Sequence, residues 1–389
     1  MWLYIPIDDA KLKIKVEPVF EIRERYERRT DKDFLSNVSD NRGDVFGRYR
    51  AGVNLKGKDF TGRFVYQYAH DWVWTLGSNS SNDRSDMVEA NASFSVDKAK
   101  VTLGRQRLAV GSQRLIGELN WHNVSNSFDA VSYERDRFSA FVAKQGVGVV
   151  PDKNLFLGGV TMKDSQGLTM AVVKTDELNN VQKGRLTLSR EGKFKLGKGS
   201  VDYQVAGQIG HEDGKAVRAW AGFARYTMPV AKKIDGFFET NIASGGKSTD
   251  TVNTFDQLYP TGHDRVGLMD TTGWQNVRQL GAGLRFNVSP KETFKVQVMD
   301  LSLYDSGDSW YGVGGGVNTR TGGTYTDATG ASGRHLGREL DLDFSYKFDT
   351  TYTLTAGAGV FWPGTFPQNL QVGSSNRQLW GYVAITKKF

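Results

Sequence analysis

The sequence predicts an all-β fold, a transmembrane antiparallel up-and-down β-barrel of about 18 strands with long extracellular loops and short periplasmic turns. Three observations predict this fold. Apolar and polar residues alternate along the chain, the gaps between alternating segments are short and long in turn, and the last segment ends on a phenylalanine. We expect all 389 residues to form one domain, 1–389, because barrels are routinely long single units.

The composition favours strands over helices. Hydrophobic residues make up 39% of the chain, the mean hydropathy is -0.46, and no run of ten apolar residues occurs. A helical membrane span, which needs about 20 apolar residues, is therefore excluded. Aromatic residues reach 12% and 45 glycines accompany only 8 prolines, a mixture typical of strands and tight turns. The absence of cysteine excludes disulfides and thiol chemistry.

The predicted strands show a period of two residues. The clearest segment is 279–288, where leucines, Phe286 and Val288 alternate with glycines and polar residues that include Arg285. Similar segments cover residues 45–54, 88–96, 201–209 and 336–347. We count about eighteen segments of roughly 10 residues each, as expected for an outer-membrane barrel.

The gaps between these segments alternate in length. Short gaps occur at residues 96–99, 134–137, 289–291 and 348–351, and longer gaps at 79–84, 110–126, 244–272, 305–334 and 363–376. Short turns on one side and long loops on the other are typical of a barrel in an asymmetric membrane. A soluble β-sandwich would show the same alternation, but it seldom uses so many strands, and its polar faces carry Thr and Lys rather than Gly and Arg.

The closing segment, residues 377–389, ends on Phe389, and Leu379, Val383 and Ile385 share its phase. This ending resembles the terminal signature by which outer-membrane proteins are recognised for assembly, although Lys387 departs from the usual apolar residue. The N-terminus has no basic region followed by a long apolar run, so we expect a mature form from which a signal peptide has been removed. The expected location is the bacterial outer membrane, and the expected partners are the lipid bilayer, lipopolysaccharide and the barrel assembly machinery.

Several arginines are predicted to face the barrel interior. The chain has 50 Lys and Arg against 43 Asp and Glu, a net charge of +7. A charge facing lipid at mid-bilayer costs about 2–4 kcal/mol, so arginines opposite the apolar phase should point inward. These residues are Arg48, Arg50, Arg63, Arg185, Arg218 and Arg285.

Arg105 and Arg107 share the phase of Val101 and Leu103, which would turn them toward lipid. We expect a β-bulge at Gly104 to turn both arginines inward, because glycine is a common site for bulges. The alternative is that the strand has already left the apolar band at this point.

Three stretches resemble the alginate export family of outer-membrane barrels. They are residues 103–130, residues 254–276, and residues 335–342 together with 361–364 and the closing segment. The resemblance covers the chain from about residue 100 to its end, whereas the first hundred residues match only in style. It implies an eighteen-stranded monomeric barrel, lined with Arg and Lys, through which the polyuronate alginate diffuses outward.

The chemistry of arginine fits that implied function. Its planar fork suits carboxylates and stays charged at any relevant pH, and many modest sites allow a polymer to leave as easily as it enters. The predicted lumen residues are therefore the six inward arginines together with Arg105, Arg107, Arg114 and Asp129. Inward carboxylates such as Asp129 either fix neighbouring side chains or hold particular arginines in place and narrow the channel.

Other kinds of site have little support. The five histidines have no partner at metal-ligand spacing, so no metal site or cofactor is expected, although calcium could bind Glu339, Asp341 and Asp343 or a loop with Asp300, Asp305 and Asp308. No nucleophile pattern or phosphate-loop motif is complete, so we expect neither an enzyme nor a nucleic-acid partner. The leading hypothesis is a passive, anion-selective channel for an alginate-like polysaccharide. A porin for small anionic solutes and a plugged structural or adhesive barrel are the alternatives.

Overall fold

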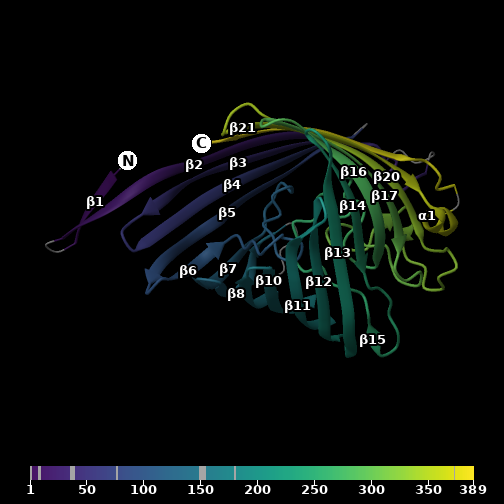
Figure 1. Ribbon diagram of the computed structural model, residues 1–389, viewed down its shortest axis with the longest axis horizontal. Helices are drawn as coiled ribbons and strands as arrows, with labels where there is room; N and C mark the ends of the chain where they lie inside the picture. Colours follow the sequence, from purple (N-terminus) through teal and green to yellow (C-terminus); the bar gives the residue numbers. More distant parts are fainter. Residues whose placement is uncertain are drawn as a thin grey trace.

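The computed structural model describes residues 2–7, 10–35, 40–75, 78–148, 155–178, 181–371 and 373–389, and the following statements concern these residues. Eighteen strands in this part of the chain pair with their neighbours in one antiparallel ring, which closes where the last strand, β22, pairs with β2. The predicted barrel is thereby confirmed, and a two-sheet sandwich is excluded. Figure 1 shows the strands curving around a central space.

The strands of the ring are β2 (Ala10–Thr30), β3 (Arg42–Lys56), β4 (Phe60–Thr75), β5 (Ser78–Val96), β6 (Ala99–Gln106), β7 (Ser127–Arg135), β8 (Phe138–Val147), β9 (Phe156–Asp164), β10 (Gly167–Leu178), β11 (Val181–Leu196), β12 (Gly199–Glu212), β13 (Lys215–Ala231), β14 (Ile234–Ala243), β16 (Val277–Ser289), β17 (Glu292–Leu303), β20 (His335–Lys347), β21 (Tyr352–Pro363) and β22 (Gln378–Lys388). Short elements lie outside the ring: β1 (Trp2–Ile7), β15 (Thr251–Val252), β18 (Thr319–Arg320), β19 (Gly323–Thr324) and α1 (Thr365–Leu370). None of the helices in the described residues is long and apolar enough to cross a membrane.

The outer face of the ring is apolar and exposed. Leu280 on β16 is 68% exposed and Val205 on β12 is 53% exposed. On each strand the residues that alternate with these exposed side chains point to the interior. Exposure of large apolar side chains along every strand is what a lipid-facing surface requires. The period of two therefore separates a lipid face from a lumen face, as the sequence predicts.

The loops differ at the two ends of the barrel. Tight turns at residues 97–98, 136–137, 290–291 and 348–351 join strands at one end, and connections over residues 107–126, 244–276, 304–334 and 364–377 join them at the other. These long loops lie at the extracellular end in barrels of this kind. The long loop predicted over residues 79–84 is wrong, because these residues belong to β5, which pairs with β4 as far as Thr75 and Ser78.

The long loops fold back into the barrel. Leu115, Phe255, Leu268 and Trp310, all from loops, belong to one buried apolar cluster together with inward side chains of the wall such as Phe361. Figure 1 shows the segment between β6 and β7 running into the space that the strands enclose. The extracellular half of the barrel therefore has an apolar core of its own, which leaves the open part of the lumen beside β2 to β6.

Candidate functional site

Four buried arginines on two adjacent strands form one side of the open lumen. Arg23 and Arg25 project from β2, and Arg48 and Arg50 from β3, with Arg23 opposite Arg48 in the register. They point inward because exposed Phe20 and Ile22 on β2 hold the opposite phase. We call these four residues the arginine wall.

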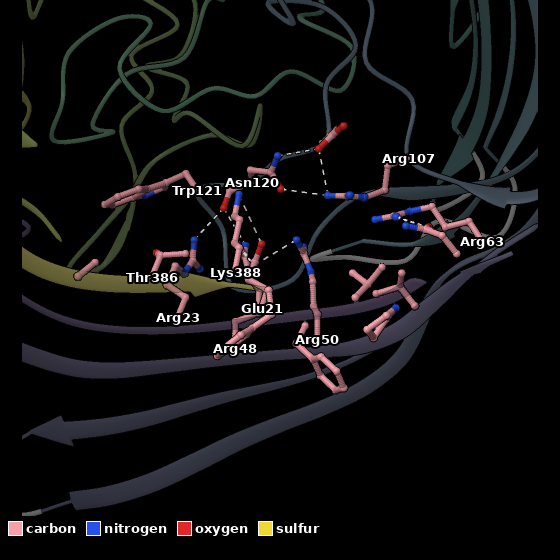
Figure 2. Close-up of a pocket in the computed structure, with 18 of the residues that line it drawn as sticks. Glu21, Arg23, Arg48, Arg50, Arg63, Arg107, Asn120, Trp121, Thr386 and Lys388 are labelled. Atoms are coloured by element: carbon pink, nitrogen blue, oxygen red, sulfur yellow. Dashed lines mark hydrogen bonds and ion pairs between the residues drawn. The ribbon is translucent and has the colours of Figure 1, made fainter. Parts of the chain in front are cut away.

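The arginine wall borders a cavity of about 670 Å³. Figure 2 shows Arg23, Arg48 and Arg50 of the wall below the cavity, Asn120 and Trp121 of the β6–β7 loop above it, and Arg63 and Arg107 to one side. The side chains that line the cavity include six arginines and Lys388 but only three carboxylates, Glu17, Glu21 and Glu118. This excess of four positive charges attracts anions and repels cations.

A second cavity of about 380 Å³ continues from the first past Arg63 and Arg107. Its far side is the inner face of β5 and β6, which presents the amides and hydroxyls of Asn91, Ser93, Thr102 and Gln106. One side of the open lumen is therefore cationic, whereas the other combines these uncharged hydrogen-bonding groups with Glu89 on β5 and Lys100 on β6. A ligand with both carboxylates and hydroxyls is complementary to the two surfaces.

Carboxylates hold several of these arginines in place. Glu21 lies 2.6 Å from Arg48 and 3.3 Å from Arg50, and Glu89 lies 2.9 Å from Arg63 and 3.3 Å from Arg107. Each carboxylate thus serves two guanidinium groups, and Glu118 is a further partner 3.0 Å from Arg107. Glu21 therefore orients Arg48 and Arg50 without neutralising both, whereas Glu89 and Glu118 together balance Arg63 and Arg107. Pre-orientation lowers the entropy that a bound anion would cost.

The β6–β7 loop crosses the arginine wall. The carbonyl oxygen of Asn120 accepts hydrogen bonds from Arg23 and Arg48, and that of Trp121 accepts one from Arg25. The indole of Trp121 lies between the Arg25 guanidinium, 4.0 Å from its centroid, and the His263 ring at 3.6 Å. We call residues 118–125 the crossing segment.

Buried carboxylates also anchor the β14–β16 loop. Glu339 and Asp341 on β20 accept hydrogen bonds from the backbone amides of Met269 and Leu268, and Lys295 on β17 lies 2.6 Å from Asp264. Lys295 and the burial of Asp264 act in opposite directions, and the pKa of this loop carboxyl lies below its ordinary value because Lys295 prevails. The β14–β16 loop is therefore bonded to the inner faces of β17 and β20, the side of the barrel that packs against the apolar core.

A charged cluster on β10 and β11 fixes the same loop to another part of the barrel. Lys174 on β10 lies 2.8 Å from Asp256, and Arg185 on β11 donates a hydrogen bond to the carbonyl of Thr254. Burial would raise the pKa of Asp256, but Lys174 and Arg185 hold it well below the ordinary value. Arg185 also pairs with Glu212, so this predicted lumen arginine has a structural place under the loop.

The structure brings four of the predicted residues together and separates the others. Arg48, Arg50, Arg63 and Arg107 all line the main cavity. Arg114 is buried in the β6–β7 loop, where it bonds Asn241 and stacks on Phe223, and burial lowers its pKa to about 9. Arg285 faces inward opposite the phase of exposed Leu284, but on β16, far along the ring from β2.

Arg105, Asp129 and Arg218 do not face the lumen, and their predicted inward positions are wrong. Arg105 and Asp129 form a two-pronged ion pair in the outer phase that also contains exposed Leu103 and Val131. Arg218 shares the outer phase of Trp220, while Val217 and Ala219 point into the loop core. The phase rule fails at these positions because the inner residues beside them, such as Phe128 and Val217, are apolar and pack against loops.

The expected bulge at Gly104 is absent. The register between β5 and β6 runs without a shift from Val96 to Ala90, although Gly104 has a φ of 107°. The irregularity lies instead between β4 and β5, where Val88 is skipped. Arg107 lies beyond β6, which ends at Gln106, and it lines the main cavity, whereas Arg105 stays in the outer phase near the end of the strand.

Sequence reasoning missed Arg23, Arg25 and Lys388. The signal is present, since Phe20, Ile22 and Tyr26 alternate with Arg23 and Arg25. Glu24 interrupts the apolar phase and hides the pattern. In the structure Glu24 stays on the outer face and accepts a hydrogen bond from the Tyr49 hydroxyl, which satisfies the carboxylate there.

The carboxylates proposed for calcium are engaged by protein partners, among them Glu339 and Asp341, which accept hydrogen bonds from the β14–β16 loop. Asp300 pairs with Arg338, and Asp308 accepts hydrogen bonds from Gly246 and Thr254, so both carboxylates have protein partners. Within the described residues, no group of three or more His, Asp or Glu side chains could hold a metal ion.

Comparison with known families matches the family described as alginate export to residues 17–145 and 177–381. The chain belongs to the alginate export family. A search of curated proteins finds no match. The arginine wall of this chain therefore lies inside a barrel of the alginate export family.

Solved structures share the fold at low sequence identity. Pseudomonas aeruginosa OpdQ is 11% identical with a TM-score of 0.63, and the match covers 96% of this chain and 99% of that one. P. aeruginosa OccK5 (OpdH) is 10% identical, TM-score 0.60, over 96% and 98%. P. aeruginosa OccK2 (OpdF) in complex with glucuronate is 8% identical, TM-score 0.61, over 96% and 98%. Family and fold are those of outer-membrane channels, and this chain is an outer-membrane barrel.

Proposed function

We propose that this chain is a passive channel for acidic sugars and that its principal substrate is a polymer of uronate units, as in alginate. The observation that carries the proposal is the cavity on the arginine wall, where seven cationic side chains face three carboxylates. Membership of the alginate export family supports a polymeric substrate. We further propose that the barrel acts as a monomer and is inserted by the barrel assembly machinery.

The spacing of the wall suits a ligand with repeated charges. Residues two apart on a strand are separated by roughly 6.6 Å, so Arg23 and Arg25 form successive levels along β2. Glu27, which lies 3.3 Å from Arg25, occupies the next level, and beyond it Arg29 lines a further cavity of about 400 Å³ with Lys32. A carboxylate released by one level meets the next, and such weak, repeated sites permit transit.

Uptake of small acidic solutes is the second candidate. The crossing segment narrows the lumen, and a cavity of about 670 Å³ has the size of an ordinary small-ligand site. The structural neighbour OccK2 was solved with glucuronate, a monomeric uronate. A plugged structural barrel, the third candidate, would also have an extracellular half filled by loops. Whether the protein conducts ions is therefore the first property to measure.

Conductance of the purified protein in a planar bilayer tests these candidates. We expect an anion-selective current that a soluble uronate polymer blocks at a lower concentration of uronate units than free glucuronate does. Equal block by polymer and monomer would favour the small-solute porin. A cation-selective current would contradict the proposal, and a barrel without current would indicate a plugged lumen.

A further inference from the structure

Three consecutive carbonyl groups of the crossing segment occupy the donors of the arginine wall. Asn120 O lies 2.7 Å from Arg23 Nη1 and 2.8 Å from Arg48 Nη1. Trp121 O lies 2.6 Å from Arg25 Nη1, and His122 O lies 3.2 Å from Arg23 Nη2 and 3.1 Å from Arg48 Nη1. Figure 2 shows Asn120 and Trp121 directly over Arg23 and Arg48.

Asn123 fastens this segment to the barrel. Its side-chain amide donates to the backbone carbonyls of Gly47 on β3 and His70 on β4, at 2.9 and 2.7 Å, and its side-chain oxygen accepts from Arg23 at 3.2 Å. The next residue, Val124, is 9% exposed and belongs to a small apolar cluster with Val65. Besides these contacts and its carbonyls, the segment is held by Glu118, which lies 3.0 Å from Arg107, by the stacking of Trp121 on His263, and by the Ser125 hydroxyl, which accepts a hydrogen bond from Arg50.

These carbonyls are weak ligands for the groups that they bind. A carbonyl carries only a partial charge, whereas hydrogen bonds from arginine to a carboxylate are shorter and about twice as strong. Glu21 is the carboxylate that pairs with Arg48 and Arg50. Arg25 Nε lies 3.3 Å from Glu27, whereas the buried Nε of Arg23 has no hydrogen-bond partner. A carboxylate that reached Arg23 would satisfy more of the guanidinium than the carbonyl does.

We propose that the crossing segment is an autoinhibitory contact, in which the carbonyls of Asn120, Trp121 and His122 stand in for substrate carboxylates, and that an acidic saccharide opens the lumen by displacing them. The inference rests on the proposed function and names the way in which that function is regulated. Displacement exchanges one set of hydrogen bonds for another at the same guanidinium groups.

The contacts of the flanking residues limit the movement to a short stretch. Before the segment, Gly117 N donates to Tyr259 O at 2.8 Å, and after it Ser127 begins β7. Leu119 has a φ of 55°, a left-handed conformation that is costly for leucine and would be relieved by release. Leu119 N also donates to Thr261 Oγ1 at 3.1 Å, and the Ser125 hydroxyl accepts from Arg50, so the stretch that lifts in this proposal is residues 120–124, while the rest of the loop stays in the core.

Cysteine accessibility at Val124 tests the proposal, because the chain has no native cysteine. In Val124→Cys, a buried thiol should react slowly with a membrane-impermeant maleimide while the crossing segment is seated. We expect trimannuronate to raise the labelling rate about tenfold or more. Maltotriose, which is neutral and of equal length, should leave the rate unchanged.

A second buried cysteine serves as the matched control. Val266→Cys lies in the β14–β16 loop and is 2% exposed, so trimannuronate should not alter its labelling. Slower or unchanged labelling of Val124→Cys with trimannuronate would show that the ligand binds over a fixed segment and would overturn the proposal. Faster labelling at both positions would also overturn it, since the whole loop core would then be opening.

A variant labelled without ligand provides an independent test of how the crossing segment is held. Asn123→Ala in the Val124→Cys background removes both bonds to the strands, and we expect labelling to accelerate about tenfold, the factor given by about 1.4 kcal/mol of lost hydrogen bonding. An unchanged rate would contradict the role of Asn123. Ion selectivity of the unmodified channel is measured in parallel: anion selectivity without ligand-induced labelling refutes only the displacement, whereas cation selectivity refutes the proposed function.

Discussion

Replacing Arg63 by glutamine should weaken the anion selectivity of the channel without damaging the barrel. Arg63 lines both open cavities and its side chain is 33% exposed, so it faces the solvent that ions cross. Its partner Glu89 keeps a second cation, Arg107 at 3.3 Å, so the variant leaves no buried carboxylate without a counter-charge.

The size of the effect follows from Coulomb's law. An ion passing about 6 Å from Arg63 in a water-filled lumen interacts with it by about 0.7 kcal/mol, which screening at 0.1 M salt reduces to about 0.4 kcal/mol. Loss of the charge disfavours an anion and favours a cation by that amount. The difference of about 0.8 kcal/mol corresponds to a roughly fourfold fall in the anion-to-cation permeability ratio.

Reversal potentials in a salt gradient across a planar bilayer measure this ratio. Arg218→Gln is the matched control, because it removes the same charge from the chain but on the outer face, beside Trp220. We expect the control to leave the reversal potential unchanged. If both variants shift it equally, or if Arg63→Gln has no effect, the assignment of the ion path to the two cavities that Arg63 lines is wrong.

Three further changes probe the support of the site. Lys174→Met should lower stability by about 3 kcal/mol at pH 7, because it leaves the Asp256 carboxylate with Arg185 as its remaining nearby cation. The pKa of Asp256 is held well below its ordinary 3.8, so this stabilisation is present above pH 3.8 and is lost as the pH falls toward the folded-state pKa; the unfolding temperatures of the variant and the unmodified protein should therefore begin to converge only below pH 4. Gly104→Ala places a Cβ 2.4 Å from a backbone oxygen at a φ of 107°, and a loss of about 1–3 kcal/mol should appear as a lower unfolding temperature on heating in detergent; an unchanged temperature would contradict the strain. Trp121→Ala empties the end of the main cavity and should raise single-channel conductance while the sign of selectivity is kept; a lower conductance would contradict a constricting role.

The sequence predicted the barrel well because lipid imposes one rule on the outer face of most strands. Arg48, Arg50 and Arg63 follow from that rule directly, since a charge opposite Phe64 or Tyr49 has only the lumen to face. The closing strand and the alternation of short and long gaps could also be predicted, because both depend on the residues of the local segment alone.

The prediction failed where the inner face obeys a different rule. Around Arg218 and Asp129 the inward residues are apolar, because Val217 and Phe128 pack on loops that fold into the barrel. Alternation cannot tell an apolar face that meets lipid from one that meets a loop. The crossing of the arginine wall by Asn120 depends on the path of a twenty-residue loop, which no periodicity in the sequence records.

The apolar core inside the extracellular half gives this membrane protein a second source of stability. Side chains on the lipid face gain little from leaving an apolar solvent, whereas Phe255, Trp310 and Phe361 are removed from water when the loops dock. Their partners come from segments more than a hundred residues apart, and Arg29 on β2 reaches Met269 O only when β22 has closed the ring. Ring closure and packing of the core are therefore one cooperative event, and that event completes late in assembly because it awaits the last strand of the chain.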